Sequence, residues 1–219
     1  MEKVLVLCDD LWHPAEIIEK GLAARNDQRF EFDVIKAAKD VLTPERIAKY
    51  RLIVCCKSNS VIAANNAPWF EPGVTEVCPK EFEDYIRAGG GFLAVHSGLA
   101  YNKQRCAEYV DLVGSQFISH PPRCTVNLHV VQPEHPIMEG ITDFVIRDEH
   151  YGMEMTCEDA DIFLESSSEK GGVQPTGYTR TMGKGRLCAL TPGHTLDVWE
   201  NPLFQKMFTN AMEWCLQER

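Results

Sequence analysis

The stretch GGGFLAVHSG at residues 89–98 has the pattern of a short strand that ends in a sharp turn. Its three glycines follow a segment with helical spacing, Pro79 to Ala88, and glycine is favoured just beyond a helix end. The apolar run from Phe92 to Val95 predicts a buried strand. The segment from Leu99 to Val113 predicts another helix. His96 therefore stands at a strand-to-helix turn, where one side chain is held above the end of a sheet.

The N-terminal side of this stretch repeats the alternation of strands and helices. The spacing of Ala15, Ile18 and Leu22 predicts a helix, and Thr43-Pro44 has the residues of a helix start, with the threonine as the cap. Strands that alternate with helices are joined by right-handed crossovers and lie parallel in one sheet. These strands are expected at Lys3–Cys8, Phe30–Ile35 and Leu52–Cys56.

The second half of the chain has a different pattern. Two strand-like segments separated by short turns, Thr125–Val131 and Asp143–Arg147, predict an antiparallel extension of the sheet. Arg186–Leu190 predicts a last buried strand, and Pro202–Leu216 predicts a closing helix. The polar, glycine-containing segment Ser166–Gly177 is expected to be a mobile surface loop.

Together these elements predict a three-layer α/β fold: a mainly parallel sheet with helices on both faces and an antiparallel extension. A chain of 219 residues suits one domain with a sizeable core. Because no linker, repeat or low-complexity tract divides the chain, a single domain over residues 1–219 is expected.

Charge and composition exclude several classes of function. The formal net charge of -10 would repel phosphate backbones, so no nucleic-acid partner is expected. No apolar run reaches the roughly 18 residues of a membrane span, so no membrane partner is expected either. The chain starts without a signal-peptide pattern, and nine cysteines, several within apolar runs, indicate reduced thiols. A cytoplasmic protein is therefore expected, and a homo-oligomer is compatible with the sequence.

Three of the loops that would follow parallel strands contain a histidine: His13, His96 and His194. In open parallel sheets ligands bind outside the carboxyl ends of the strands, so these imidazoles are expected to converge. Imidazole carries protons near neutral pH and also ligates borderline metals. Two alternatives stay open: a divalent metal such as zinc held by the three histidines, or an organic site in which they bind substrate and transfer protons.

Several short motifs occur in an order that covers the chain from about residue 4 to residue 216. The longest is the stretch at 89–98, and the others are Trp12-His13, Val113-Gly114, His120-Pro121, His135-Pro136-Ile137, Asp148-Glu149, Tyr151-Gly152, Gly183 to Arg186, Thr191 to Thr195, Asn201-Pro202 and Trp214. This ordered set resembles the ThuA-like proteins, which are named for trehalose utilisation. The resemblance implies a class I glutamine amidotransferase-like fold and a role in carbohydrate utilisation.

The resemblance also shows what this chain lacks. The amidotransferases carry a cysteine at the turn after the strand, and that position corresponds to His96 here. Their catalytic histidine corresponds to His194, and Leu196 stands where the third member of the triad would be. Without a thiolate at the turn the amidotransferase mechanism is lost, so no glutaminase activity is expected.

The resemblance places the segment that contains Glu149 near the site. A carboxylate among histidines serves as a metal ligand or as a general base. His96, His194 and Glu149 are therefore the expected catalytic residues. The expected substrate-binding residues are Trp12, His13, Ser97, His120 and Tyr151.

Aromatic and cysteine side chains near strand ends have more than one interpretation. Trp12 and Trp69 would suit stacking on a sugar ring, or they pack in the core. Trp69 belongs to the long connection Lys57–Gly73, which is expected to be a lid, a binding loop or a surface loop. The vicinal pair Cys55-Cys56 is expected to consist of core thiols.

The remaining histidines and carboxylates are weaker candidates. His120 and His135 each precede a proline, which restricts them to extended geometry. A structural turn is favoured for His135, whereas both roles stay open for His120. Asp9, Asp10 and Glu154 are expected to be solvated loop carboxylates.

Two functions from different classes follow. The first is an enzyme, a hydrolase or an isomerase, that acts on a sugar or oxidised (keto) sugar by histidine and carboxylate acid–base chemistry, with or without a metal. The second is a non-catalytic metabolite-binding or regulatory domain on the same fold. A thiol-dependent hydrolase would need a reactive cysteine at a strand end, and only Cys56 stands at one. The expected partner is a small-molecule carbohydrate.

Overall fold

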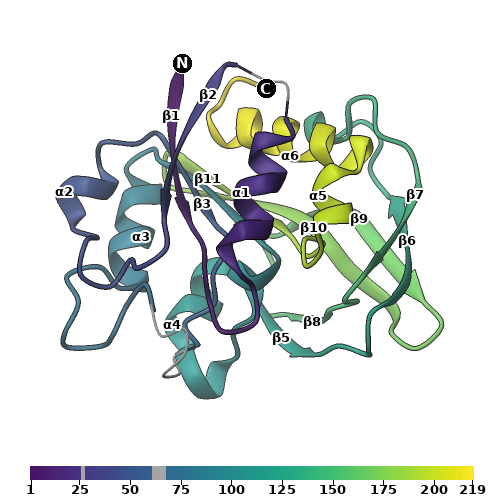
Figure 1. The fold of residues 1–219 in the computed structure, drawn as a ribbon, viewed down its shortest axis with the longest axis horizontal. Helices are drawn as coiled ribbons and strands as arrows, with labels where there is room; N and C mark the ends of the chain where they lie inside the picture. The colour runs from purple at the N-terminus through teal and green to yellow at the C-terminus, as the bar shows by residue number, and fades with distance from the viewer. Residues whose placement is uncertain (26–27, 61–67) are drawn as a thin grey trace.

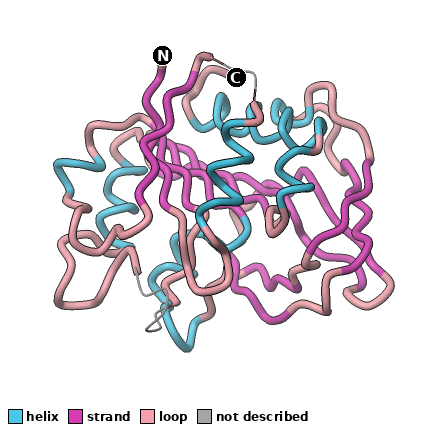
Figure 2. The backbone as a smooth tube through the Cα atoms, viewed as in Figure 1, coloured by secondary structure: helices cyan, strands magenta, loops and turns pink. Residues whose placement is uncertain are grey.

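A computed structural model of the chain describes residues 1–25, 28–60 and 68–219. Its main feature is a nine-stranded sheet in the order β2-β1-β3-β4-β11-β10-β9-β6-β7, with helices on both faces (Figures 1 and 2). The predicted α/β class, a largely parallel sheet with an antiparallel extension, is confirmed.

Five neighbouring strands form the parallel half of the sheet and share one direction. The four inner strands contain short apolar runs that are buried on both faces, as the sequence predicts for parallel strands, whereas the edge strand is partly exposed. Their carboxyl ends lie at one edge, so the turns that follow them are brought side by side. In sheet order they are β2 (Phe30–Ile35), β1 (Glu2–Leu7), β3 (Leu52–Cys55), β4 (Gly91–Val95) and β11 (Gly185–Leu190).

Helices cover this half on both faces because alternate strand residues point to opposite sides. Val4 and Val6 join the core cluster that contains the buried residues of α1 (Ala15–Ala23), α5 (Leu196–Glu200) and α6 (Pro202–Cys215). Leu5 and Leu7 join the cluster that contains those of α2 (Pro44–Ile47), α3 (Pro79–Arg87) and α4 (Lys103–Val113). The Thr43 side chain caps α2, as predicted, by accepting a hydrogen bond from Arg46 N at 3.1 Å.

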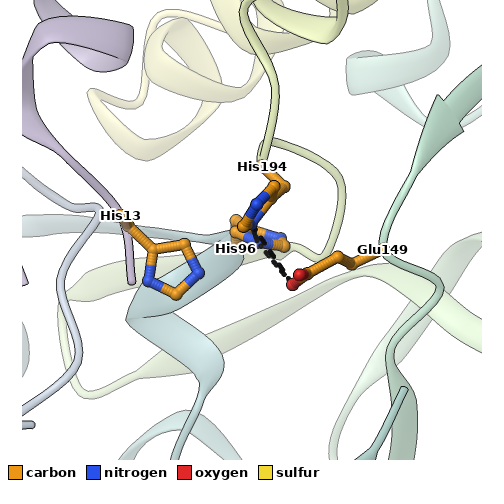
Figure 3. Close-up of side chains that lie close together, drawn as sticks. All are labelled: His13, His96, Glu149 and His194. Carbon is orange, nitrogen blue, oxygen red and sulfur yellow. Dashed lines mark hydrogen bonds and ion pairs between the residues drawn. The ribbon is translucent and has the colours of Figure 1, made fainter. Parts of the chain in front are cut away.

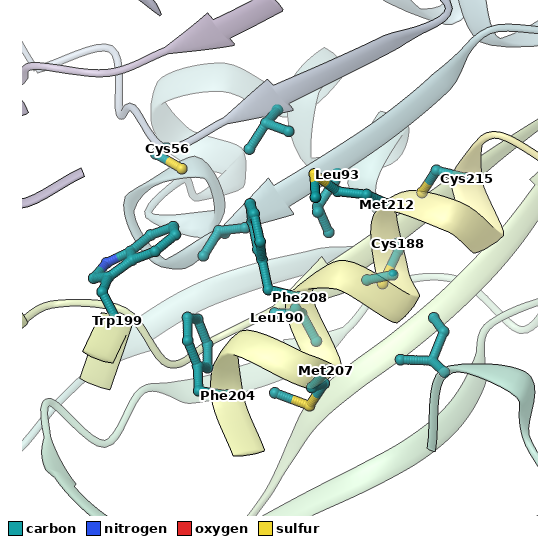
Figure 4. Packing of buried hydrophobic residues seen from close by; sticks show 14 of the residues in the cluster. Cys56, Leu93, Cys188, Leu190, Trp199, Phe204, Met207, Phe208, Met212 and Cys215 are labelled. Carbon is teal, nitrogen blue, oxygen red and sulfur yellow. The ribbon is translucent and has the colours of Figure 1, made fainter. Parts of the chain in front are cut away.

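The closing helix α6 provides much of the first core. Its side chains Phe204, Phe208 and Met212 lie in one cluster with Leu93 of β4 and Leu190 of β11 (Figure 4). The helix thus packs across the two strands whose following turns carry His96 and His194, and this fixes those turns relative to each other.

The second half of the sheet is antiparallel throughout. One strand of a separate two-stranded ribbon precedes this half in the chain, the other ribbon strand lies between two of its strands, and a short helical turn joins another two. The four strands are β10 (Gly172–Met182), β9 (Asp161–Ser168), β6 (Cys124–Val130) and β7 (Phe144–Asp148); the ribbon consists of β5 (Ser115–Ser119) and β8 (Gly152–Met155), and the turn is η2 (Pro136–Met138).

The prediction that Ser166–Gly177 is a mobile surface loop is wrong. These residues form the end of β9, a turn and the start of β10. Ser166 and Thr176 are buried, and the hydroxyl of Ser166 bonds to the ring of His150. A polar pattern indicates a loop only when the polar groups face water, and here they satisfy one another inside the protein.

The helix predicted over Leu99–Val113 is interrupted at its start. Residues His96–Leu99 form a 3₁₀ turn, η1, and α4 begins only at Lys103. Asn102 ends the connection by accepting a hydrogen bond from Arg105 N at 3.1 Å, which is the geometry of a helix cap. The extra turn keeps His96 in the connection rather than in the helix.

Two further expectations can be compared with the structure only over its described residues. Of the long connection Lys57–Gly73, positions 61–67 lie outside the described residues. Among the helices of the described ranges, none has the length and apolar character that a membrane span requires.

Candidate functional site

Three turns at the carboxyl edge of the parallel strands bring the three predicted histidines together. His13 follows β1, His96 follows β4 directly, and His194 follows β11. Their ring centroids are 4.9 to 5.3 Å apart, and the side chains face one another (Figure 3). The sequence pattern therefore located the centre of the site, because each histidine is fixed by the end of its own strand.

The turn at His96 is tight and strained. The residue has a left-handed backbone, with φ of 47°, and its side chain is only 2% exposed. A Cβ atom placed on Gly98 would lie 2.0 Å from the carbonyl oxygen of Cys55, so only glycine allows this close approach to β3. Backbone strain of this kind occurs where a side chain must be held in a set direction.

The hydrogen bonds of His96 orient its ring. Nδ1 lies 2.8 Å from the carbonyl oxygen of Thr191, which can only accept, so Nδ1 carries the hydrogen. The other nitrogen, Nε2, lies 3.2 Å from His194 Nδ1 and 3.2 Å from the hydroxyl of Tyr151. Burial opposes the charged form of His96, but Glu149, Asp148 and the Thr191 carbonyl raise its pKa above the ordinary value.

His13 is held in a similar way by a carboxylate. Its Nδ1 lies 2.7 Å from Oδ1 of Asp10. The same oxygen accepts a hydrogen bond from Trp12 N at 2.9 Å, and Oδ2 accepts one from Ser58 N at 2.7 Å. Burial alone would raise the pKa of Asp10, but the hydrogen bonds from His13, Ser58 and Trp12 lower it to about 2. The expectation that Asp10 is a solvated loop carboxylate is wrong, since its exposure is 0%.

The second ring nitrogen of His13, Nε2, has no hydrogen-bond partner among the described residues. The atom is also buried within the protein. Buried polar atoms are nearly always bonded, and each exception calls for an explanation such as an ion or a ligand. Burial and the nearby imidazoles of His96 and His194 lower the pKa of His13, although Asp10 acts in the opposite direction.

Glu149 completes the cluster from the antiparallel half of the protein. Its Oε2 lies 3.2 Å from His194 Nδ1, 3.5 Å from His96 Nε2 and 3.6 Å from His120 Nε2. Burial would raise the pKa of Glu149, but the hydrogen bonds from His194 and His96 lower it well below its usual range. The carboxylate is thus ionised and shared among imidazoles.

Asp148 is a residue of the site that sequence reasoning missed. It is fully buried, and its carboxylate accepts hydrogen bonds from Gly193 N at 2.7 Å and His194 N at 3.2 Å. Gly193 has φ of 143°, a conformation that favours glycine, and Trp199 Nε1 donates to its carbonyl at 2.8 Å. Asp148 and Trp199 together fix the turn that presents His194. The signal in the sequence was its position next to Glu149.

A cavity of about 540 Å³ opens beside this cluster. Its size and its mixture of aromatic walls and convergent polar groups are typical of a small-molecule site. The lining residues are Trp12, His13, Ala100, Phe117, His120, Arg123, Glu149, Tyr151 and His194. A cavity of similar volume, about 560 Å³, lies beside α2 and α3, but none of its described lining residues is a histidine or a cysteine.

The predicted substrate-binding residues differ in where they lie. Trp12 is 67% exposed at the cavity, and the buried ring of Tyr151 stacks on His96 with centroids 4.3 Å apart. Ser97 is buried within η1 and is not one of the described lining residues. Trp69 is fully buried in the core against Phe82, so the sugar-stacking interpretation of Trp69 is wrong.

The structure also locates three weaker candidates, His135, Glu154 and Cys56. His135 stacks on Phe163 and accepts a hydrogen bond from Ile137 N at 3.2 Å, which confirms a structural turn. Glu154 is exposed on β8, as expected. Cys56 is buried, and burial raises its pKa well above the ordinary value, so the thiol is not poised to react.

The arrangement has the composition of a metal site. One ligand atom from each of His13, His96, Glu149 and His194 lies within 4.8 Å of all the others. Three imidazole nitrogens and one carboxylate oxygen are a donor set that zinc accepts.

The family model described as ThuA, trehalose utilisation, matches residues 3–215. The chain belongs to the ThuA family. This membership supports a role in carbohydrate utilisation. No curated protein matches the chain.

Solved structures show the same ThuA fold. A putative thua-like protein from Parabacteroides merdae superposes with a TM-score of 0.79 at 17% identity, covering 100% of this chain and 91% of that chain. One from Bacteroides uniformis gives 0.76 at 18% identity, covering 98% and 91%. A protein from Salmonella typhimurium described as cytoplasmic gives 0.66 at 12% identity, covering 98% and 99%.

Proposed function

We propose that the chain is an enzyme that acts on a sugar or oxidised (keto) sugar, with His96, His194 and Glu149 as the catalytic residues and a divalent metal held among them and His13. One observation carries this proposal. The Nδ1 atoms of His13 and His96 each face an acceptor, so the Nε2 atom of each ring is directed toward the cluster that holds the ionised carboxylate of Glu149. Ring nitrogens and a carboxylate that converge in this way need a cation or a proton between them.

The spacing of the ligand atoms supports a metal. Zinc binds nitrogen and oxygen ligands at roughly 2.0–2.2 Å in tetrahedral geometry, which puts neighbouring ligand atoms about 3.4 Å apart. The distances among His96 Nε2, His194 Nδ1 and Glu149 Oε2 are 3.2, 3.2 and 3.5 Å. When bound, such a metal would polarise a carbonyl or hydroxyl oxygen of the substrate.

The cavity supports a carbohydrate ligand. Trp12, Phe117 and Tyr151 supply aromatic surface on which the apolar face of a sugar ring can stack, and His120 and Arg123 supply donors for its oxygens. Eight of the nine described lining residues carry an aromatic ring, an imidazole or a charge, which suits a polar ring better than a fatty chain. A cytoplasmic location is part of the proposal, supported by the nine free cysteines.

A second candidate is acid–base chemistry at the same cluster without a metal. The raised pKa of His96 favours a proton between its Nε2 and Glu149, and the buried phenol of Tyr151 lies 3.2 Å from the same nitrogen. In that case Glu149 or His194 accepts one proton from the substrate while the Tyr151 hydroxyl donates one to it. A purely metabolite-binding domain would use the same contacts but show no turnover.

Metal titration separates these candidates. The protein is purified without an affinity tag, and zinc and manganese are titrated by calorimetry into wild type, His96→Ala and His194→Ala. We expect micromolar or tighter binding to the wild type that both substitutions weaken at least tenfold. His129→Ala is the matched control, because that histidine lies on β6 and bonds to Ser167 outside the cluster.

Two outcomes would contradict the proposal. Binding that is equal in wild type and both variants would remove the metal and leave the acid–base candidate. A panel of sugars and keto sugars that bind to the metal-loaded protein without any turnover would leave the metabolite-binding domain.

A further inference from the structure

Behind the imidazole of His13, on its Nδ1 side, lies a buried pair of opposite charges. Asp10 and Lys57 are both 0% exposed. The ammonium group of Lys57 donates to the backbone carbonyl of Asp9 and attracts the carboxylate of Asp10. Burying either charge is costly unless other groups compensate, so a buried charged pair next to a site suggests a task beyond folding.

The hydrogen bonds of Asp10 determine where His13 carries its proton. Among the described residues, Trp12 N, His13 N and His13 Nδ1 donate to Oδ1 of this carboxylate, and Ser58 N donates to Oδ2. A carboxylate that receives donors on both oxygens is ionised and can only accept. The ring hydrogen of His13 therefore sits on Nδ1, and the orphaned Nε2 presents its lone pair to the cluster.

His96 obtains the same tautomer from a weaker acceptor. Its Nδ1 donates to the neutral backbone carbonyl of Thr191, whereas the Nδ1 of His13 donates to a full negative charge. A carboxylate behind an imidazole raises the basicity of the other ring nitrogen more than a carbonyl does. His13 is also the cluster histidine whose Nε2 is buried without a hydrogen-bond partner among the described residues, so its tautomer depends on this support.

We propose that Asp10, balanced by Lys57, is a positioning residue that fixes His13 as the Nδ1–H tautomer and so makes its Nε2 available to an electrophile in the site. An amide cannot replace the carboxylate, because its N–H₂ group would face either Ser58 N–H or the three donors at Oδ1. The consequence for metal binding rests on the proposed function, but the tautomer itself does not.

The tautomer can be read directly by NMR. Histidine is labelled with ¹⁵N, and long-range ¹H–¹⁵N spectra are recorded without metal at mildly alkaline pH, with the His13 signals assigned from His13→Gln. We expect His13 as the Nδ1–H form in wild type and a shift toward the Nε2–H form in Asp10→Ala. Asp148→Ala is the matched control: it also removes a buried carboxylate of the site, but one that holds backbone N–H groups and not the ring of His13.

If Asp10 served only to stabilise the fold, the Asp10→Ala experiment would give a different result. In that case Asp10→Ala would lower the melting temperature as Asp148→Ala does, yet leave the His13 tautomer unchanged, and the proposal would be wrong. If Asp10→Ala does not fold, the wild-type spectrum still decides, because His13 protonated on Nε2 would overturn the proposal without any variant.

Zinc affinity provides a second readout. Asp10→Ala is expected to weaken zinc binding by roughly 10- to 100-fold while His13 remains present. If zinc binds neither protein but the tautomer changes as expected, the positioning role stands and the metal proposal fails. If both proteins bind zinc equally well, Asp10 does not support His13 as a ligand and the proposal fails.

Discussion

His96 Nε2 lies 3.2 Å from His194 Nδ1, although the two residues are 98 positions apart in the chain. They meet because β4 and β11 are parallel neighbours, paired from Gly91 with Arg186 to Val95 with Leu190. Both strands therefore end at the same level, and the residues that follow them face each other. The pairing of the strands, rather than the length of chain between them, sets the distance between the imidazoles.

Replacing His96 should remove function and also cost stability. Its ring is buried and bonded to the Thr191 carbonyl, and an alanine in its place would keep the left-handed backbone. We expect His96→Ala to abolish turnover and to lower the free energy of unfolding by about 2 kcal/mol. Urea unfolding measures this loss. His120→Ala, at an exposed lining residue, should change stability by no more than about 0.5 kcal/mol; equal losses in both variants would contradict the burial of His96.

The cysteines should be irrelevant to activity. Burial raises the pKa of Cys8 to about 12 and that of Cys55 to about 11, and no cysteine is among the described residues that line the cavity. Alkylation of the native protein should therefore leave turnover of a sugar substrate unchanged, and glutamine should release no ammonia in a coupled assay. Ammonia release that alkylation blocks would instead indicate Cys56 as a nucleophile.

A methyl group at Gly98 should disrupt the turn that carries His96. The added Cβ would lie 2.0 Å from the backbone oxygen of Cys55, which no side-chain rotation can relieve. We expect Gly98→Ala to destabilise the protein by about 3 kcal/mol, measured by urea unfolding. Gly172→Ala is the control, because a Cβ there would meet no atom within 4 Å; its positive φ alone should cost only about 1 kcal/mol. Similar losses at both positions would mean that the turn has room to adjust.

Acidification should weaken the protein partly through His135. Burial lowers the pKa of His135, and its Nδ1 can accept from Ile137 N–H only when unprotonated. The unfolded chain takes up this proton first, so the stabilisation is complete above about pH 6.5 and is lost as the pH falls through the lower folded value. His135→Asn keeps an acceptor at the cap without titrating, and thermal melts from pH 8 to pH 5 should show a smaller decline than in wild type. An identical decline would exclude His135 as a contributor.

The sequence was sufficient to predict features that depend on a residue and its immediate neighbours. The strand ahead of His96 is an apolar run closed by a turn, and the same local pattern positions His13 and His194. Convergence then follows from the rule that parallel strands end at one edge. These parts of the fold and the site needed no knowledge of distant contacts.

Features that depend on partners elsewhere in the chain could not be predicted. Asp10 is satisfied in the interior because Ser58 of another loop donates to it, and Asp148 gains its role from the backbone N–H groups of Gly193 and His194. Ser166 lies in a strand because His150 satisfies its hydroxyl. A polar residue looks the same in a sequence whether water or a distant group provides its hydrogen bond.

The two halves of the sheet contribute different kinds of residue to the histidine cluster and to the cavity beside it. His13, His96 and His194 come from the turns of the parallel half, whereas Phe117, His120, Arg123, Glu149 and Tyr151 come from residues 115–155, next to or within the antiparallel half. In evolution, Phe117, His120 and Arg123 can be exchanged without disturbing the strands that position the imidazoles or the segment that holds Glu149. A family built on this plan can vary the small molecule that the cavity admits while keeping one cluster of imidazoles and carboxylate.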